Sequence, residues 1–150
     1  MNKKVLLIED DKSKIEKVIN YLVDYEITVK ESFQGGINEL KNSSSLYSFL
    51  LLDMTIPMWE KGDNDLGGNY EQFGGERILR EMKRKKIVIP TILFTMFDVF
   101  PTKEKSITFD ELNDAYKSKF PDFYIGAVYY NSTDEHWKID MASLIKSVNE

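Results

Sequence analysis

The chain has 150 residues, of which 42% are apolar and 13% aromatic, a size and composition that fit one globular domain with a sizeable core. Its net charge of -5 comes from intermixed acidic and basic residues without a large basic block, which argues against a nucleic-acid partner. The absence of cysteine excludes disulfides and thiolate metal sites. The first apolar run is too short for a signal peptide or a membrane span, so we expect a single cytoplasmic domain over residues 1–150.

In the first half of the chain, short apolar runs alternate with amphipathic segments, a pattern typical of strands and helices that build a parallel sheet. Residues 4–8 are predicted to form the first strand and residues 12–23 a helix with one apolar face. The alternating residues 27–29 suit an edge strand, and residues 36–41 indicate a short helix. Residues 49–52 are apolar at every position, as expected for a central strand covered on both faces.

The second half continues the same alternation. Residues 75–83 predict a third helix, and residues 87–95 the next buried strand. A capping box at residues 108–111 predicts the start of a fourth helix that ends at Phe120. Residues 123–130 form the last predicted strand.

The final predicted helix follows a second expected capping box at residues 132–135. Its apolar side chains share one face and are Trp137, Met141, Leu144, Ile145 and Val148.

Two connections are longer than such a domain needs, at about residues 58–74 and 96–108. Long connections in a compact domain are commonly functional or disordered. Our hypothesis is that both lie, as a docking surface or lid, over the edge of the sheet where the acidic residues Glu9, Asp10 and Asp53 are expected. The alternative is that they pack on their own domain. The hypothesis depends on four aromatic side chains, which are Trp59, Phe73, Phe97 and Phe100.

Acidic residues follow two of the buried strands directly. Glu9 and Asp10 come after the first strand, and Asp53 follows the predicted central strand. If these strands are neighbours, the three side chains meet at the edge where open α/β sheets hold their ligands. Like charges so close repel unless a cation lies among them, so this pattern predicts a functional site that binds a divalent ion.

The segments at residues 4–11, 51–57 and 90–95 together resemble the receiver domain of two-component response regulators. They carry the acid pair, an aspartate at a strand end with a proline four residues later, and a threonine at the end of the next strand. The resemblance spans nearly the whole chain. It implies a flavodoxin-like (βα)5 fold, with a five-stranded parallel sheet in the order 2-1-3-4-5 and helices on both faces.

The resemblance also implies roles for individual residues. Asp53 would accept a phosphoryl group from a sensor histidine kinase or a phosphotransfer protein. Glu9, Asp10, Asp53 and the backbone carbonyl of Thr55 would hold Mg²⁺, and Thr95 would hydrogen-bond the phosphoryl group. These assignments agree with the oxygen ligands that Mg²⁺ prefers and with the charge neutralisation that phosphoryl transfer needs.

The chain departs from the receiver pattern at two places. Receivers carry a lysine at the end of the last strand, where residues 127–132 contain none, and Lys138 lies too far into the final helix to replace it. Tyr129 or Tyr130 is the candidate for the aromatic switch residue of the family. Met96 stands where receivers usually have a small residue, so access to the acceptor is expected to be restricted.

Two functional hypotheses follow from the resemblance. The first is a stand-alone response regulator that is phosphorylated with Mg²⁺ and signals through a separate downstream protein; its chemistry would be at most self-phosphorylation and autodephosphorylation. The second is a pseudo-receiver, a docking module that works without phosphorylation. We favour the first, because an acidic cluster kept without a metal would be an electrostatic cost. The sequence leaves open whether two copies pair.

Overall fold

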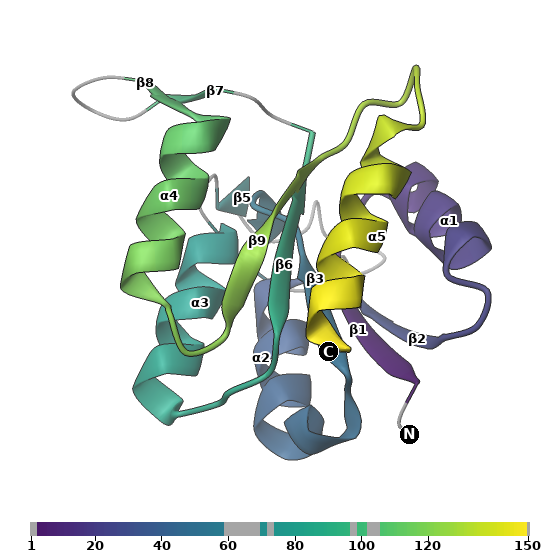
Figure 1. Ribbon diagram of the computed structural model, residues 1–150. Coiled ribbons are helices and arrows are strands. Elements are labelled where there is room, and N and C mark those ends of the chain that lie inside the picture. Colours follow the sequence, from purple (N-terminus) through teal and green to yellow (C-terminus); the bar gives the residue numbers. More distant parts are fainter. Residues whose placement is uncertain (1–2, 59–69, 72–73, 97–98, 102–105, 150) are drawn as a thin grey trace, which may run out of the picture.

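The centre of the molecule is a five-stranded parallel sheet (Figure 1). Its strands are β1 (Lys4–Ile8), β2 (Glu26–Lys30), β3 (Phe49–Leu52), β6 (Thr91–Thr95) and β9 (Tyr124–Tyr129). They are arranged in the order β2-β1-β3-β6-β9, and every neighbouring pair is parallel. The computed structural model describes residues 3–58, 70–71, 74–96, 99–101 and 106–149.

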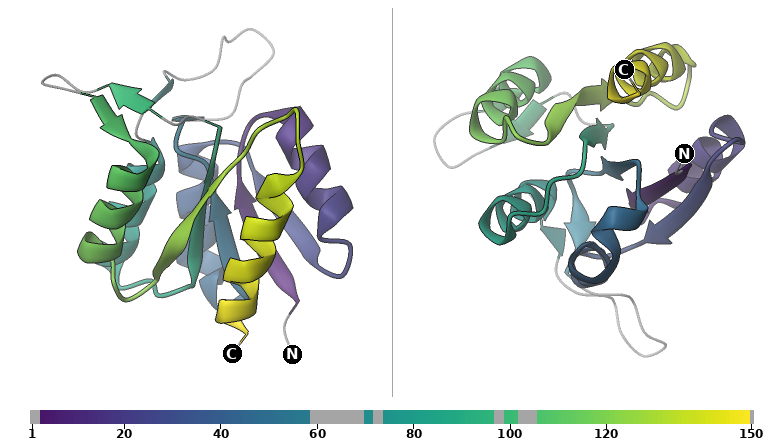
Figure 2. Two further views of the ribbon diagram at one scale, coloured as in Figure 1. Left: turned by 45° about the horizontal axis from the view of Figure 1, so that its top comes forward. Right: turned by 60° about the horizontal axis from the view of Figure 1, so that its bottom comes forward.

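Helices cover both faces of this sheet. On one face lie α1 (Lys12–Tyr21) and α5 (His136–Val148), as Figures 1 and 2 show. On the other face lie α2 (Phe33–Ser43), α3 (Gly74–Lys85) and α4 (Phe109–Lys119), with a short 3₁₀ helix η1 (Ser44–Leu46) after α2. Among the described residues, no helix has the length and apolar character to cross a membrane.

The main sheet has the predicted order when its five strands are counted along the chain. Two short antiparallel pairs were not predicted. β4 (Ile56–Pro57) pairs with β5 (Tyr70–Glu71), and β7 (Val99–Pro101) pairs with β8 (Ser106–Thr108). The first pair joins the residues just before the connection at 58–74 to residues near its end, and the second pair lies within the connection at 96–108. The lid hypothesis is untested: Trp59, Phe73 and Phe97 lie outside the described residues, as does the side chain of Phe100.

The core consists of two apolar clusters, one on each face of the sheet. Side chains alternate between them along each strand, so Leu6 and Ile8 join the cluster under α2, α3 and α4, whereas Val5 and Leu7 join the cluster under α1 and α5. These four apolar residues of β1 are fully buried, and each such side chain contributes about 1.5–3 kcal/mol. This double burial explains why the strands read as continuous apolar runs.

Three local predictions were wrong. The strand predicted over residues 87–95 is shorter, since β6 begins at Thr91. The second helix is longer than expected, because the Ser32 side chain accepts a hydrogen bond from the Gly35 amide and caps a helix that starts at Phe33, which is itself buried. The second capping box does not form, since the residue before α5 is Glu135 and makes no side-chain cap. Asn131 Oδ1 instead accepts the Thr133 amide at 2.9 Å and shapes the turn.

The first capping box is confirmed. The Thr108 hydroxyl accepts the Glu111 amide at 3.1 Å, and the Glu111 carboxylate accepts the Thr108 amide at 3.0 Å. The predicted apolar face of the last helix is also confirmed: Trp137, Met141 and Ile145 are buried against the sheet. The reciprocal cap fixes where α4 begins, directly after β8.

Candidate functional site

The predicted acidic residues meet at the carboxyl edge of the sheet, the upper edge in Figure 1. β1 and β3 are neighbours with Ile8 opposite Leu52, so the residues that follow them lie side by side, and the Asp53 amide donates to the Ile8 carbonyl at 3.0 Å. Carboxylate oxygens of Glu9, Asp10 and Asp53 lie within 4.8 Å of one another. The convergence predicted from the sequence is therefore observed.

The three carboxylates differ in burial. Glu9 is 1% exposed and Asp53 is 6% exposed, whereas Asp10 is half-buried. A cleft of about 300 Å³ opens over them, lined by Glu9, Asp10, Asp11, Lys14, Asp53, Thr55 and Met96. The cleft gives a small ligand or ion access to buried anions.

Asp53 is oriented by the backbone around it. One carboxylate oxygen, Oδ1, accepts the amide of Met54 at 2.8 Å. The amino end of α3 packs directly behind this turn, where the Gly75 amide donates to the Met54 carbonyl at 2.8 Å. A side chain at Gly75 would place its Cβ only 2.5 Å from the Asp53 carbonyl oxygen, so glycine permits this approach. The strand end that carries the carboxylate is thereby fixed by backbone contacts.

Lys14 is the site residue that sequence analysis missed. Its Nζ lies 2.6 Å from Glu9 Oε1 and 3.4 Å from Asp53 Oδ1, and it donates to the Phe94 carbonyl at 3.3 Å. The residue is 1% exposed. The lysine is three residues after Asp11, which caps α1 by accepting the amides of Ser13 and Lys14. Its position three residues after the cap places this side chain on the buried face of α1, together with Ile15 and Val18. The signal in the sequence was therefore a lysine on the apolar face of a predicted helix.

The charges shift one another's protonation. Burial, reinforced by the charge of Asp53, raises the pKa of Glu9 to about 8, although Lys14 acts in the opposite direction. Burial also raises the pKa of Asp53. For Lys14, burial alone would lower the pKa, but the attraction of Asp53 and Glu9 prevails and raises it. The lysine therefore stays charged, and the metal-free cluster holds protons more tightly than exposed carboxylates do.

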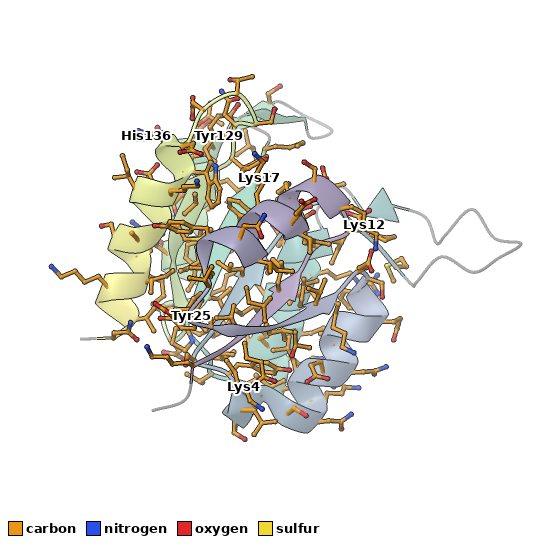
Figure 3. The ribbon with its side chains drawn as sticks, turned by 90° about the vertical axis from the view of Figure 1, so that its right-hand side faces the viewer. Lys4, Lys12, Lys17, Tyr25, Tyr129 and His136 are labelled. Carbon is orange, nitrogen blue, oxygen red and sulfur yellow. The ribbon has the colours of Figure 1, made fainter. Side chains whose placement is uncertain are left out.

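Thr95 and the two tyrosines come from the next strands of the sheet. Thr95 is fully buried at the end of β6 and pairs with Tyr129 across the ladder. Tyr129 is 38% exposed and contacts the ring of Phe109 edge-on, whereas Tyr130 is buried and packs against Phe94. The exposed Tyr129 thus fits an outward-facing switch better than Tyr130. Figure 3 shows Tyr129 at the same end of the molecule as His136.

Lys138 does not replace the missing strand-end lysine. Its ammonium pairs with Glu135 at 2.9 Å and lies over the rings of Tyr21 and Trp137, on the side of α5. Its exclusion from the site on sequence grounds agrees with these contacts.

The donor set suits a hard divalent cation. Three carboxylates supply oxygen ligands within one small volume, and Thr55 lines the same cleft. Glu9 Oε1 is buried and, apart from its ion pair with Lys14, has no well-directed hydrogen bond among the described residues. Glu9 Oε1 is held by the Lys14 ammonium, and by their donor type the three carboxylates fit Mg²⁺.

The parallel sheet, the helices on both faces and the acids at its carboxyl edge define the fold of response regulator receiver domains. Solved structures agree. A CheY-like receiver domain protein from Methanospirillum hungatei superposes with a TM-score of 0.61 at 17% identity, over 98% of this chain and 93% of that one. The Borrelia burgdorferi CheX-CheY-BeF3-Mg complex gives a TM-score of 0.64 at 12% identity, over 98% of this chain and 89% of that one. The predicted flavodoxin-like receiver fold is confirmed.

Two curated proteins are similar over almost their full length. The Detocs response regulatory protein DtcB of Enterobacter cloacae is 29% identical over 153 residues, covering 97% of this chain and 98% of that protein. The uncharacterized protein y4jR of Sinorhizobium fredii is 24% identical over 141 residues, covering 90% and 91%. No protein-family model matches the chain. The predicted resemblance to response regulator receivers is thus confirmed by the similarity to DtcB as well as by fold.

Proposed function

We propose that this protein is a response regulator receiver that accepts a phosphoryl group on Asp53 in the presence of Mg²⁺ and passes the signal to a partner protein. The observation that carries the proposal is the position of Asp53, which follows the central strand and opens into a cleft with Glu9 and Asp10. Similarity to a response regulatory protein, DtcB, supports the same conclusion. A neighbour in fold was solved with BeF3 and Mg²⁺, which supports the choice of metal.

In this mechanism a carboxylate oxygen of Asp53 attacks the phosphorus of a phosphohistidine on a sensor kinase or phosphotransfer protein. An oxygen–phosphorus bond forms, the phosphorus–nitrogen bond breaks, and the electron pair returns to the imidazole. Glu9, Asp10, Asp53 and the carbonyl of Thr55 would hold Mg²⁺, which supplies positive charge to the transferring group when bound. Thr95, at the end of the adjacent strand, would donate its hydroxyl hydrogen to a phosphoryl oxygen.

The signal would leave the site through the strand next to Thr95. Tyr129 is the ladder partner of Thr95, and its ring contacts Phe109 at the start of α4. A shift of the Thr95 side chain toward a phosphoryl group would therefore change the positions of the exposed Tyr129 and of the amino end of α4.

The test is direct phosphorylation. The protein is incubated with acetyl phosphate, or with beryllium fluoride, with and without Mg²⁺. Intact mass is recorded for the wild type, and fluorescence for Trp59→Phe, in which Trp137 is the remaining tryptophan. We expect one Mg²⁺-dependent adduct, absent from Asp53→Asn, and a fluorescence change because Trp137 packs on Phe94, next to Thr95. If neither reagent gives an adduct or a change, phosphorylation on Asp53 is refuted, and the docking module that works without phosphorylation takes its place.

A further inference from the structure

Lys14 places a positive charge inside the acidic cluster. Its ammonium group has three hydrogens, and it has three oxygen partners: Glu9 Oε1, Asp53 Oδ1 and the Phe94 carbonyl. Among the residues that the structure describes, it is the only buried lysine. A charge is tolerated in a buried site only when it has charged or hydrogen-bonding partners, and Lys14 has three. The lysine is therefore an integral part of the acidic cluster.

The surroundings of Lys14 hold its ammonium in place. The Nζ lies 5.0 Å from the ring centroid of Phe94 and 5.8 Å from that of Tyr130, distances at which aromatic faces attract a cation. Tyr130 directly follows β9, at the strand end that has no lysine. The cation of this site therefore comes from α1, and an aromatic ring stands at the end of the last strand.

The ammonium and a divalent ion need the same oxygens. Lys14 uses Glu9 and Asp53, which are two of the three carboxylates that could ligate a metal. Two cations on the same pair of oxygens repel strongly in a buried site. Lys14 already compensates one of the buried negative charges, so the acidic cluster does not require a metal for its neutralisation.

We propose that Lys14 is a tethered counter-ion that competes with Mg²⁺ for the acidic cluster, so that the metal must displace the lysine ammonium from Glu9 and Asp53 before the site is loaded. This inference rests on one part of the proposed function, namely that Glu9, Asp10 and Asp53 form the Mg²⁺ site. Its consequence is a weakened affinity for Mg²⁺ and a site that stays neutralised when the metal is scarce. The half-buried Asp10 lines the same cleft and offers the entering ion a ligand.

The test compares Mg²⁺ binding by calorimetry to the wild type, to Lys14→Gln and to Lys17→Gln. Lys17 lies one turn further along α1 and is exposed, so it is the matched control; Figure 3 looks onto this helix. We expect the dissociation constant for Mg²⁺ to fall at least about tenfold in Lys14→Gln, because one adjacent positive charge is removed, and less than about twofold in Lys17→Gln. Lys14→Arg keeps the charge and should keep the weak binding. An unchanged or weaker affinity in Lys14→Gln overturns the inference.

A second measurement needs no variant. In wild-type protein with ¹⁵N-labelled lysine, the buried Lys14 ammonium should give a signal protected from exchange with water, and saturating Mg²⁺ should abolish that protection. Bound Mg²⁺ that leaves the signal unchanged overturns the inference, even if Lys14→Gln does not fold. Rescue of folding of Lys14→Gln by Mg²⁺ supports it.

The two proposals can fail separately. If the wild type is phosphorylated with Mg²⁺ but Lys14→Gln binds the metal no better, the counter-ion inference fails and the proposed function stands. If the wild type binds no Mg²⁺ and shows no adduct while Lys14→Gln binds the ion, competition by Lys14 is supported and Mg²⁺-dependent phosphorylation of this chain is refuted.

Discussion

Substitution of Gly75 by alanine should disturb the strand end that carries Asp53, the proposed acceptor. The added Cβ would lie 2.5 Å from the Asp53 carbonyl oxygen and 3.0 Å from Met54 Cα, both of which are backbone atoms. Restoring an ordinary contact requires α3 and the strand end to separate by about 0.9 Å, and such overpacking costs about 1–3 kcal/mol. Weakening the hydrogen bond from the Gly75 amide to Met54 adds about 1 kcal/mol. We expect a total loss of about 2–4 kcal/mol.

Urea denaturation followed by circular dichroism measures this loss, which corresponds to a decrease of the melting temperature by about 5–10 °C. The comparison variant is Gly36→Ala, whose Cβ would lie 2.6 Å from Ile8 Cδ1 and 3.2 Å from Ile8 Cγ1, which are side-chain atoms rather than backbone. Because a side chain can shift more easily than backbone, and because alanine is favoured over glycine by about 1 kcal/mol inside a helix, Gly36→Ala should lose less stability than Gly75→Ala. Equal effects of the two substitutions would refute the reasoning. Phosphorylation of Asp53 should slow about tenfold or more in Gly75→Ala, because the carboxylate moves.

Three further predictions concern the cleft. Asp11→Ala removes both hydrogen bonds that cap α1 and should cost about 1 kcal/mol in urea denaturation, and an unchanged midpoint would contradict that role of the cap. Met96 lines the cleft beside Asp53, so Met96→Ala should admit water and shorten the lifetime of phosphorylated Asp53 several-fold; decay followed by intact mass would count against this shielding if the rate stayed the same. The pKa of Glu9 is about 8 in the folded protein against an ordinary 4.5, so the folded state binds more protons between these values. The free energy of unfolding of the metal-free protein should therefore decrease as the pH rises from about 5 to 8. In Glu9→Gln this pH dependence should be weaker. A free energy of unfolding that increases over this range would exclude the raised pKa.

The inner strands of the main sheet could be predicted because they are buried on both faces and read as apolar runs, as in residues 49–52, whereas their order was implied by the resemblance to receiver domains. The acidic residues could be predicted because they follow those runs directly. The length of α2 could not, since its first turn depends on the Ser32 cap and on the burial of Phe33, and neither gives an apolar periodicity. The pairing of β5 with β4 could not be predicted either, because Tyr70 and Glu71 lie in a polar segment whose sequence predicts a loop.

Lys14 shows most clearly where sequence reasoning stops. A lysine in the first turn of an amphipathic helix normally faces water, as Lys12 does, where it pairs with Glu31 at 2.7 Å. Lys14 faces inward because the step from its cap places it next to Ile15 and Val18 on the buried face. The position of its ammonium depends on Glu9 and Asp53, which are distant in sequence, so only the assembled sheet identifies it as part of the site.

Strand β3 belongs to both apolar clusters, since Leu50 and Leu52 face one side of the sheet and Phe49 and Leu51 face the other. If the helices on either face of the sheet unfolded, one side of β3 would be exposed to water. The two apolar clusters are therefore expected to unfold together, which makes unfolding cooperative across the domain. The β3 amides should be among the slowest to exchange with deuterated solvent, at a rate set by global opening. Asp53, the proposed phosphoryl acceptor, thus directly follows a strand that is buried on both faces, and any rearrangement that accompanies its phosphorylation would come from the segments around it.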